Sequence, residues 1–497
     1  MCADAVKSII EKASTIGLKV RCVTSDMGSL NRGVWNANGI HSGTTCLNYK
    51  CPYPGNEGTT LYFMADVPHL LKRIKSACLK FQVIIPDDIV ENFELPTNKV
   101  NFQYVRQLAR RDSERQLKLA PQLTTEALER GQFSSMKVNV AMRVLSRDTA
   151  AALRYLVEHE HWNRQALTTA WFVDNVRKWF DLMSNRSPQM ALGQAHMEIY
   201  ENTIKFLKMM TTLYRNLRVT KGGPQMEPYK PWQSGAVLST SCVLELHEVL
   251  LQEGFKFVLT GRLSQDCLEN FFSAIRTRAK FPTPVQFRNT LKTVTVAQFL
   301  KHASGSSYEE DESTFLGEFL TPLHTSQAPG EAQPVLPEEF SLPVLQETDR
   351  QVLYYLGGYV VYTLRKTLSK CTLCADSVVQ ESDSGALPSS LLLLKEWKPG
   401  ALMRCSESVF ELLTKTEKLF QALTPQLQKL KRLNLLKQLL EKTLHMTQHV
   451  QLPTCHNIKG RVIMKYLTCR FHFLSKQLRP RLRSCPSSKS GAATLLK

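Results

Sequence analysis

The sequence lacks several features that would assign a protein to a class at once. Its 13 cysteines among 497 residues are scattered without regular pairing, which excludes the disulfide framework of a small secreted protein. It has no secretory leader and no apolar run near the roughly 20 residues of a membrane span, so we expect an intracellular protein with no membrane partner. It also has no glycine-rich phosphate loop, which excludes an ordinary P-loop GTPase.

Acidic residues are few relative to basic ones. The chain has 63 Lys and Arg against 44 Asp and Glu, which gives a net charge of +19 and a sequence pI near 9.4. Such an excess of positive charge favours polyanions, and nucleic acid is the commonest of these partners. A nuclear or ribosome-associated scaffold with a solvated basic surface would have the same charge, so composition leaves both alternatives open.

The first 85 residues have the pattern of an α/β fold. A helix over residues 5–17 precedes an alternating strand over residues 18–24, and an apolar strand over residues 60–65 runs into a helix over residues 70–79. Apolar strands of this kind are usually buried in a sheet with helices on its faces. We therefore expect a mixed sheet in residues 1–85, with a long loop between the two strands.

The rest of the chain divides by periodicity and composition. Residues 86–258 show helical periodicity without a convincing strand, which predicts an all-helical insertion. A helix over 265–278 lies in the next segment, 259–302, and residues 303–348 have the acidic, Ser- and Pro-rich composition of a disordered linker. Residues 349–480 are predicted to be helical and residues 481–497 to form a basic tail. The predicted fold class is α/β plus all-α.

Two carboxylates lie where nucleotidyl-transfer chemistry would require them. Asp26 ends the first strand, and Glu269 lies on the helix over 265–278. Glu269 is off the apolar stripe of that helix, which should face a core and consists of Leu268, Phe271, Phe272 and Ile275. Phosphodiester cleavage by paired divalent ions requires carboxylates that converge on metals about 4 Å apart. Taken singly, a turn cap and a solvated helix residue are simpler explanations for Asp26 and Glu269.

Six short segments of the chain have a recognisable order. They are residues 23–31 (VTSDMGSLN), 66–72 (DVPHLLK), 119–124 (LAPQLT), 136–138 (MKV), 180–186 (FDLMSNR) and 263–272 (LSQDCLENFF). In this order they resemble the signatures of P-element-type and THAP-domain DNA transposases. Residues 355–359 (YLGGY) resemble the family more weakly. Six ordered matches are far more specific than any one motif.

The resemblance implies a ribonuclease-H-like core that holds two Asp and one Glu (DDE). Asp26 would be the second Asp and Glu269 the Glu, both binding Mg2+ or Mn2+, while Asp66 and His69 would shape the cleft. An alternative alignment makes Asp26 and Asp66 the two Asp ligands. The partners implied are the transposon ends and target DNA in the nucleus, with a homo-oligomer expected.

The preferred alignment has a consequence for catalysis. It implies that the first three strands, the first Asp and the zinc-bearing THAP domain of the family do not occur in this sequence. We therefore expect an incomplete ribonuclease-H-like core and a catalytically incomplete transposase homologue, because removing one member of a catalytic unit usually removes nearly all activity.

The resemblance also implies a guanine-nucleotide site in the insertion, with GTP as a cofactor. The residues that match the family's motifs are Asp181, Asp266, Lys137, Ser184, Asn185 and Gln122. The two carboxylates would accept hydrogen bonds from the guanine edge, Ser184 and Asn185 would lie beside the base or sugar, and Lys137 would lie near the phosphates. Gln122 replaces a lysine that is common in the family, so phosphate binding should be weaker.

One pair of cysteines has metal-binding spacing. Cys371 and Cys374 form a C-x2-C pair that could bind Zn2+ together with two of Cys455, His456, Cys469 and His472. Because the second half of the site has irregular spacing, free buried thiols are the simpler interpretation.

Three functions are consistent with these observations. The first is a P-element-like, cut-and-paste DNA transposase homologue. The second is a domesticated or decayed remnant that binds DNA or a protein partner without catalysis, and the third is a guanine-nucleotide-binding regulator. If the first is correct, Asp26 and Glu269 must meet across the sheet.

Overall fold

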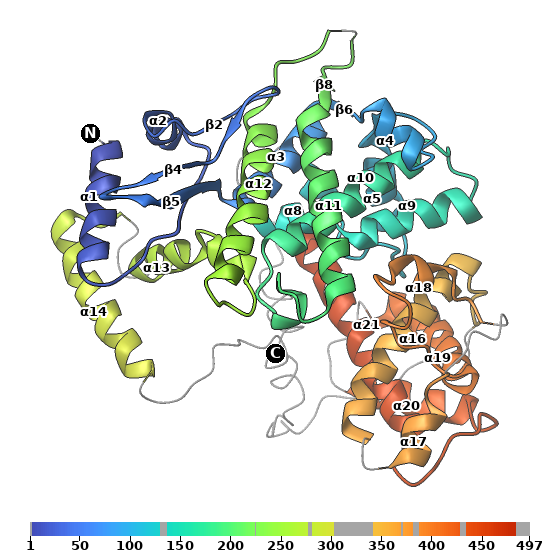
Figure 1. Cartoon of the computed structure of the whole chain (residues 1–497). Helices are drawn as coiled ribbons and strands as arrows, with labels where there is room; N and C mark the ends of the chain where they lie inside the picture. The colour runs from blue at the N-terminus through green and yellow to red at the C-terminus, as the bar shows by residue number, and fades with distance from the viewer. Residues whose placement is uncertain are drawn as a thin grey trace.

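The N-terminal part of the chain forms a small mixed sheet (Figure 1). The computed structural model describes residues 2–129, 137–223, 225–276, 281–302, 341–368, 371–380, 387–427 and 434–483. In it β1 (Cys22–Ser25) pairs in parallel with β5 (Asn56–Ala65), and β4 (Lys50–Tyr53) pairs antiparallel with the other edge of β5. The helix α1 (Cys2–Thr15) precedes β1 and ends before Gly17, whose φ of 84° is the left-handed conformation that glycine adopts easily.

The segment between the two predicted strands is not a simple loop. It holds α2 (Ser29–Ala37), the short antiparallel pair β2 (His41–Ser42) and β3 (Leu47–Asn48), and then β4. The prediction missed β4 because it contains Pro52, which has no N–H to donate. Proline is tolerated there because β4 is an edge strand of this sheet among the described residues.

The insertion is not all-helical, so that prediction was wrong in one respect. β6 (Gln82–Ile84) pairs antiparallel with both β7 (Lys99–Val100) and β8 (Arg218–Thr220). Strands of two or three residues are too short to give an alternating pattern in the sequence. The helices of this part are α3 (Val67–Lys80), α4 (Asp87–Asn92), α5 (Gln103–Glu114), α6 (Thr125–Leu128), α8 (Val138–Val144), α9 (Arg147–His159), α10 (Ala166–Met183), α11 (Met197–Asn216) and α12 (Pro231–Gln252).

The last of these helices, α12, connects the insertion to the sheet. Ser239 Oγ accepts a hydrogen bond from the N–H of Ala65 at 2.8 Å and donates to its carbonyl at 2.9 Å. Glu245 accepts hydrogen bonds from Tyr49, Lys50 and Tyr62. By length and composition α12 could span a membrane, contrary to our expectation for the sequence, but much of it is buried inside the protein. Its apolar character is accounted for by the core.

After η2 (Thr260–Leu263) the chain forms α13 (Asp266–Arg276) and α14 (Pro284–His302), which pack on each other. The predicted core stripe of α13 is only partly buried. Ile275 is buried, whereas Leu268 is 47% exposed. The stripe instead contacts α14, where the rings of Phe272 and Phe287 lie 6.3 Å apart.

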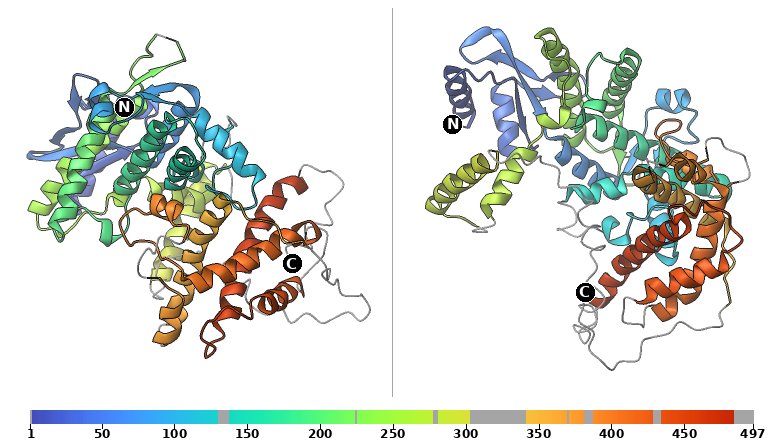
Figure 2. Two further views of the ribbon diagram at one scale, coloured as in Figure 1. Left: turned by 90° about the vertical axis from the view of Figure 1, so that its right-hand side faces the viewer. Right: turned by 90° about the horizontal axis from the view of Figure 1, so that it is seen from below.

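The C-terminal helices gather at the opposite end of the molecule from the sheet (Figures 1 and 2). They are α16 (Glu347–Leu368), α17 (Thr372–Ser377), α18 (Ser390–Lys395), α19 (Glu407–Leu427), α20 (Asn434–Met446) and α21 (Ile458–Arg483). The Gly357-Gly358 pair lies in α16, where a side chain at Gly358 would collide with the carbonyl of Met403. Residues 303–340 of the predicted linker and 484–497 of the predicted tail lie outside the described residues; 347–348 and 481–483 are helical.

Buried polar contacts join these helices to the insertion. Lys395, whose side chain is 3% exposed, pairs with Asp148 at 3.0 Å and donates to the carbonyl of Leu119 at 2.9 Å. Arg470 of α21 donates to the carbonyl of Gln116, just after α5, at 3.2 Å, and it makes two hydrogen bonds to the buried carboxylate of Glu417 on α19, at 2.8 and 3.0 Å. These contacts fix how the C-terminal helices lie on the insertion.

Candidate functional site

Asp26 lies just after β1, and the surrounding loop holds its carboxylate in one position. Its Oδ1 accepts hydrogen bonds from the N–H of Gly28 at 2.8 Å and from the amide of Asn31 at 2.7 Å. A side chain at Gly28 would lie 2.8 Å from that same oxygen, so a larger residue here would displace the carboxylate of Asp26. Partial burial acts to raise the pKa of Asp26, but the two hydrogen bonds and the positive charges of His69 and Arg73 keep the pKa below its ordinary value. Asn31 was missed as a functional residue, although it lies within the segment that resembles the family.

Asp66 follows β5 and has a structural role. Its Oδ2 accepts from the N–H of His69 at 3.1 Å and caps α3, and its Oδ1 accepts from the N–H of Gln265 at 2.8 Å. The residue is 2% exposed, and burial raises the pKa of its carboxyl. Both oxygens of Asp66 are therefore used to join α3 to the segment that begins α13.

His69 brings the two predicted catalytic carboxylates together. Its Nε2 lies 3.0 Å from Glu269 Oε1, and its Nδ1 lies 3.9 Å from Asp26 Oδ2. Thr24 fixes the approach of the two segments, because its hydroxyl donates to the carbonyl of Leu263 at 2.9 Å. The structure thus places Asp26 and Glu269 on opposite sides of one imidazole.

The site is open to solvent and has basic residues beside it. The side chains of Asp26 and Glu269 are 41% and 62% exposed. Lys72 is partly buried, which lowers its pKa, although Glu269 and Asp66 act in the opposite direction. Two exposed carboxylates next to cationic side chains could hold a divalent ion and a phosphate group at the same place.

Three of the predicted nucleotide-binding residues, Ser184, Asn185 and Asp266, lie where the end of α10 meets the start of α13. Ser184 and Asn185 follow α10, where the N–H of Asn185 bonds to Thr260 Oγ1 at 3.0 Å. The next residue, Arg186, pairs with Asp266 at the start of α13. The end of α10 is therefore in direct contact with the segment that carries Glu269.

Asp181, one turn earlier on α10, already has cationic partners. It pairs with Arg177 at 2.8 Å and lies 3.9 Å from Arg147. Burial raises the pKa of Asp181, and the two arginines offset part of this effect. Lys137 and Gln122 are exposed residues that precede α8 and α6.

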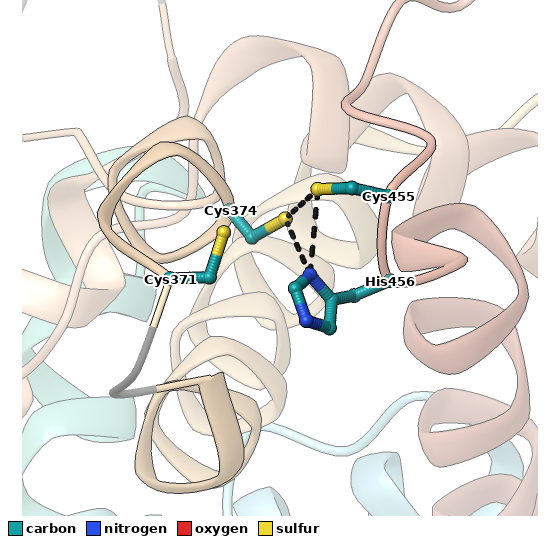
Figure 3. A group of neighbouring side chains, drawn as sticks. All are labelled: Cys371, Cys374, Cys455 and His456. Carbon is teal, nitrogen blue, oxygen red and sulfur yellow. Dashed lines mark hydrogen bonds between the residues drawn. The ribbon is translucent and has the colours of Figure 1, made fainter.

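A separate cluster lies among the C-terminal helices (Figure 3). Cys371, Cys374, Cys455 and His456 offer ligand atoms that all lie within 4.8 Å of one another. Cys371 and Cys374 form no disulfide, and they lie beside further potential metal ligands, so both the free-thiol and the Zn2+ interpretation stay open. Of the partners considered, Cys455 and His456 join the group, whereas Cys469 and His472 lie farther along α21.

Three family models match parts of the chain. Residues 69–194 match the TNP-like GTP-binding insertion domain, residues 262–292 match the TNP-like RNase H C-terminal domain, and residues 344–476 match the C-terminal domain of DNA transposase THAP9. The insertion model begins within α3 and ends before α11, so it covers only part of the helical region.

Two curated proteins are similar to more than half of the chain. The transposable element P transposase of Drosophila melanogaster is 24% identical over 297 residues, which are 58% of this chain and 37% of that protein. The human DNA transposase THAP9 is 23% identical over 281 residues, which are 55% of this chain and 30% of that protein. The matched part is thus well under half the length of either relative.

A solved structure has the same fold over much of the chain. The Drosophila P element transposase strand transfer complex matches with a TM-score of 0.51 and 21% identity, covering 59% of this chain and 64% of that one. This similarity shows a common fold over the matched part and, together with the matched RNase H C-terminal domain model, supports the predicted fold class in part.

Proposed function

Since this chain is homologous to the P element transposase and to DNA transposase THAP9, we propose that it is a transposase-type protein whose exposed carboxylates, Asp26 and Glu269, bind a divalent ion beside the DNA backbone. The observation that supports this proposal most directly is that Asp26 and Glu269, from distant parts of the chain, both face His69. Mg2+ or Mn2+ would bind between the two carboxylates, with His69 turned aside or serving as a further ligand.

The described site supports ion binding better than complete catalysis. It contains two exposed carboxylates, because Asp66 is buried and uses both oxygens as hydrogen-bond acceptors. The two-metal chemistry of strand transfer needs carboxylates on both ions. We therefore propose that this chain alone binds DNA and one divalent ion but does not cut DNA.

The presence of two exposed carboxylates at the described site also favours the second function, a non-catalytic DNA- or partner-binding protein derived from a transposon. Among the described residues β1 pairs with β5 alone, so a further acidic strand would have to join at the open edge of β1. The net charge of +19 suits a DNA partner in either case. A nuclear location and self-association belong to the proposal, and light scattering would test the latter.

Ion binding provides the direct test. We expect one Mn2+ site by titration calorimetry, lost in Asp26→Asn and in Glu269→Gln. Glu201→Gln, an exposed carboxylate on α11, is the matched control and should bind as wild type does. Equal Mn2+ binding by all four proteins would exclude the proposed site.

DNA binding and cleavage separate the two functions. We expect salt-dependent binding of duplex DNA by fluorescence anisotropy, without divalent-ion-dependent nicking of a supercoiled plasmid. Nicking that disappears in Glu269→Gln would show that the chain is catalytically complete. Lack of DNA binding at low salt would exclude the transposase function and a DNA-binding remnant, and would leave a protein partner for the second function.

We further propose that GTP binds at the C-terminal end of α10. Asp181 and Asp266 would exchange their arginine partners for the guanine edge, which would leave Arg177, Arg147 and Arg186 available for phosphate oxygens. A fluorescent GTP analogue should bind more weakly to Asp181→Asn than to wild type. Asp174→Asn, which breaks the pair between Asp174 on α10 and Arg154 on α9, is the control. Equal losses of GTP binding in both variants would contradict the assignment.

A further inference from the structure

The cysteine and histidine cluster lies far in sequence from the carboxylate site and has no role in the proposed DNA chemistry. Cys371 directly precedes the six-residue helix α17, and Cys374 lies within it. Cys455 and His456 lie in the turn before α21. Two chain segments about eighty residues apart thus present four soft or borderline ligands to one point (Figure 3).

The distances between the ligand atoms are slightly shorter than those around a bound tetrahedral cation. Cys374 Sγ lies 2.9 Å from Cys455 Sγ and 3.4 Å from His456 Nδ1, and Cys455 Sγ lies 3.3 Å from that nitrogen. Ligands around tetrahedral zinc are separated by roughly 3.6 to 3.8 Å, because Zn–S is about 2.3 Å and Zn–N about 2.0 Å. Movements well under 1 Å would accommodate the ion.

The surroundings indicate a structural ion. Cys374 is fully buried, whereas Cys455 and His456 are exposed, so the ion would lie near the surface. Four protein ligands would fill its tetrahedral coordination and leave no position for a substrate. The helix α17 has only six residues, and a helix this short is not stable without tertiary contacts. The cluster would fasten α17 to the start of α21, the helix that carries the buried Arg470.

We propose that Cys371, Cys374, Cys455 and His456 bind one structural Zn2+ that ties α17 to the N-terminus of α21. Three thiolates and one imidazole are a typical closed ligand set for zinc, and tetrahedral sulfur-rich sites select it over Mg2+ or Mn2+. The site is independent of the proposed DNA and nucleotide functions. It would hold its ion even in a chain that binds neither.

Metal content tests this site directly. Protein purified without chelator should contain about one zinc ion per chain by mass spectrometry, and Cys374→Ser and Cys455→Ser should retain less than about a tenth of it. Cys46→Ser removes an exposed cysteine outside the cluster and should leave the zinc content unchanged. Unchanged zinc in Cys374→Ser or Cys455→Ser would overturn the assignment.

Two further measurements remain decisive if the serine variants do not fold. Blocking thiols with a mercurial reagent should release the zinc from folded wild-type protein, as measured with a colorimetric chelator. His456→Cys should keep about one zinc ion, since four thiolates also form a closed site. Wild-type protein that contains no zinc, binds no added Co2+ and forms a Cys374–Cys455 disulfide would show that the cluster is a redox pair instead.

Discussion

Replacement of Asp66 is expected to remove the hydrogen bonds that hold the start of α13 against α3, and so to increase the distance between Glu269 and Asp26. The carboxylate accepts one N–H from the first turn of α3 and one from Gln265, just before α13. Asp66→Ala removes both bonds, whereas Asp66→Asn keeps one acceptor oxygen and can still cap α3. The comparison of the two variants therefore separates the cap from the link to α13.

The size of the effect can be worked out from these two contacts. Loss of a helix N-cap costs about 1 kcal/mol. The N–H of Gln265 left without an acceptor costs about 1–3 kcal/mol. Removing a buried carboxylate whose pKa is raised by burial offsets part of this loss. We expect Asp66→Ala to destabilise the region by about 2 kcal/mol and Asp66→Asn by roughly half as much.

Hydrogen exchange followed by mass spectrometry is the suitable assay, because it reports each helix separately. Asp66→Asn should lose protection in the first turn of α13 and keep it in α3, whereas Asp66→Ala should lose protection in both. The alternative alignment, with Asp66 as a metal ligand, leads to the opposite result. In that case both variants would match wild type in EDTA and differ from it only when Mn2+ is added.

Three further predictions concern other parts of the molecule. Arg470→Met should cost about 3–5 kcal/mol because it leaves Glu417 buried and unpaired, and adding Glu417→Leu should restore most of the thermal stability. Asp26 has a lowered pKa in the folded protein, so it contributes stability at pH values above its ordinary pKa of 3.8, and this contribution is lost as the pH falls through the folded pKa. The urea midpoints of wild type and Asp26→Asn should therefore differ most at neutral pH and approach each other as the pH is lowered below 3.8. Gly358→Ala should lower the melting temperature because its new methyl group meets a backbone carbonyl, whereas Gly33→Ala, which meets open space in α2, should not; equal effects would contradict the packing of α16.

Long periodic elements could be predicted from the sequence, and short ones could not. The apolar run of β5 and the stripe of α10 were evident because many residues repeat the same pattern. The strands β6 and β8 have three residues each, so only their pairing in the fold identifies them. The exposure of Leu268 could not be predicted either, because a stripe shows which residues share a face but not what covers that face.

The metal cluster shows a similar limit. The spacing of Cys371 and Cys374 predicted two ligands of a metal site. The other two ligands could not be chosen from the sequence among Cys455, His456, Cys469 and His472. Cys469 is eleven residues into α21, which places it about 16 Å along the helix axis from the first residue. Cys455 and His456 precede that helix and can reach Cys374. Only the position of the helix start decides between them.

Asp26 and Asp66 show why sequence left their roles open. Both come directly after parallel strands, and the pairing of Ser25 with Ala65 places the two aspartates side by side at the carboxyl ends of β1 and β5. Their different roles arise from the residues that come next in the chain. After Asp66 the sequence is Val-Pro-His, in which proline occupies a first-turn position and Asp66 becomes the cap, covered by the segment before α13. After Asp26 it is Met-Gly, which turns the chain away and leaves the second oxygen of Asp26 facing His69. An aspartate that follows a parallel strand and is itself followed by a first-turn proline is therefore more consistent with a helix cap than with a metal ligand.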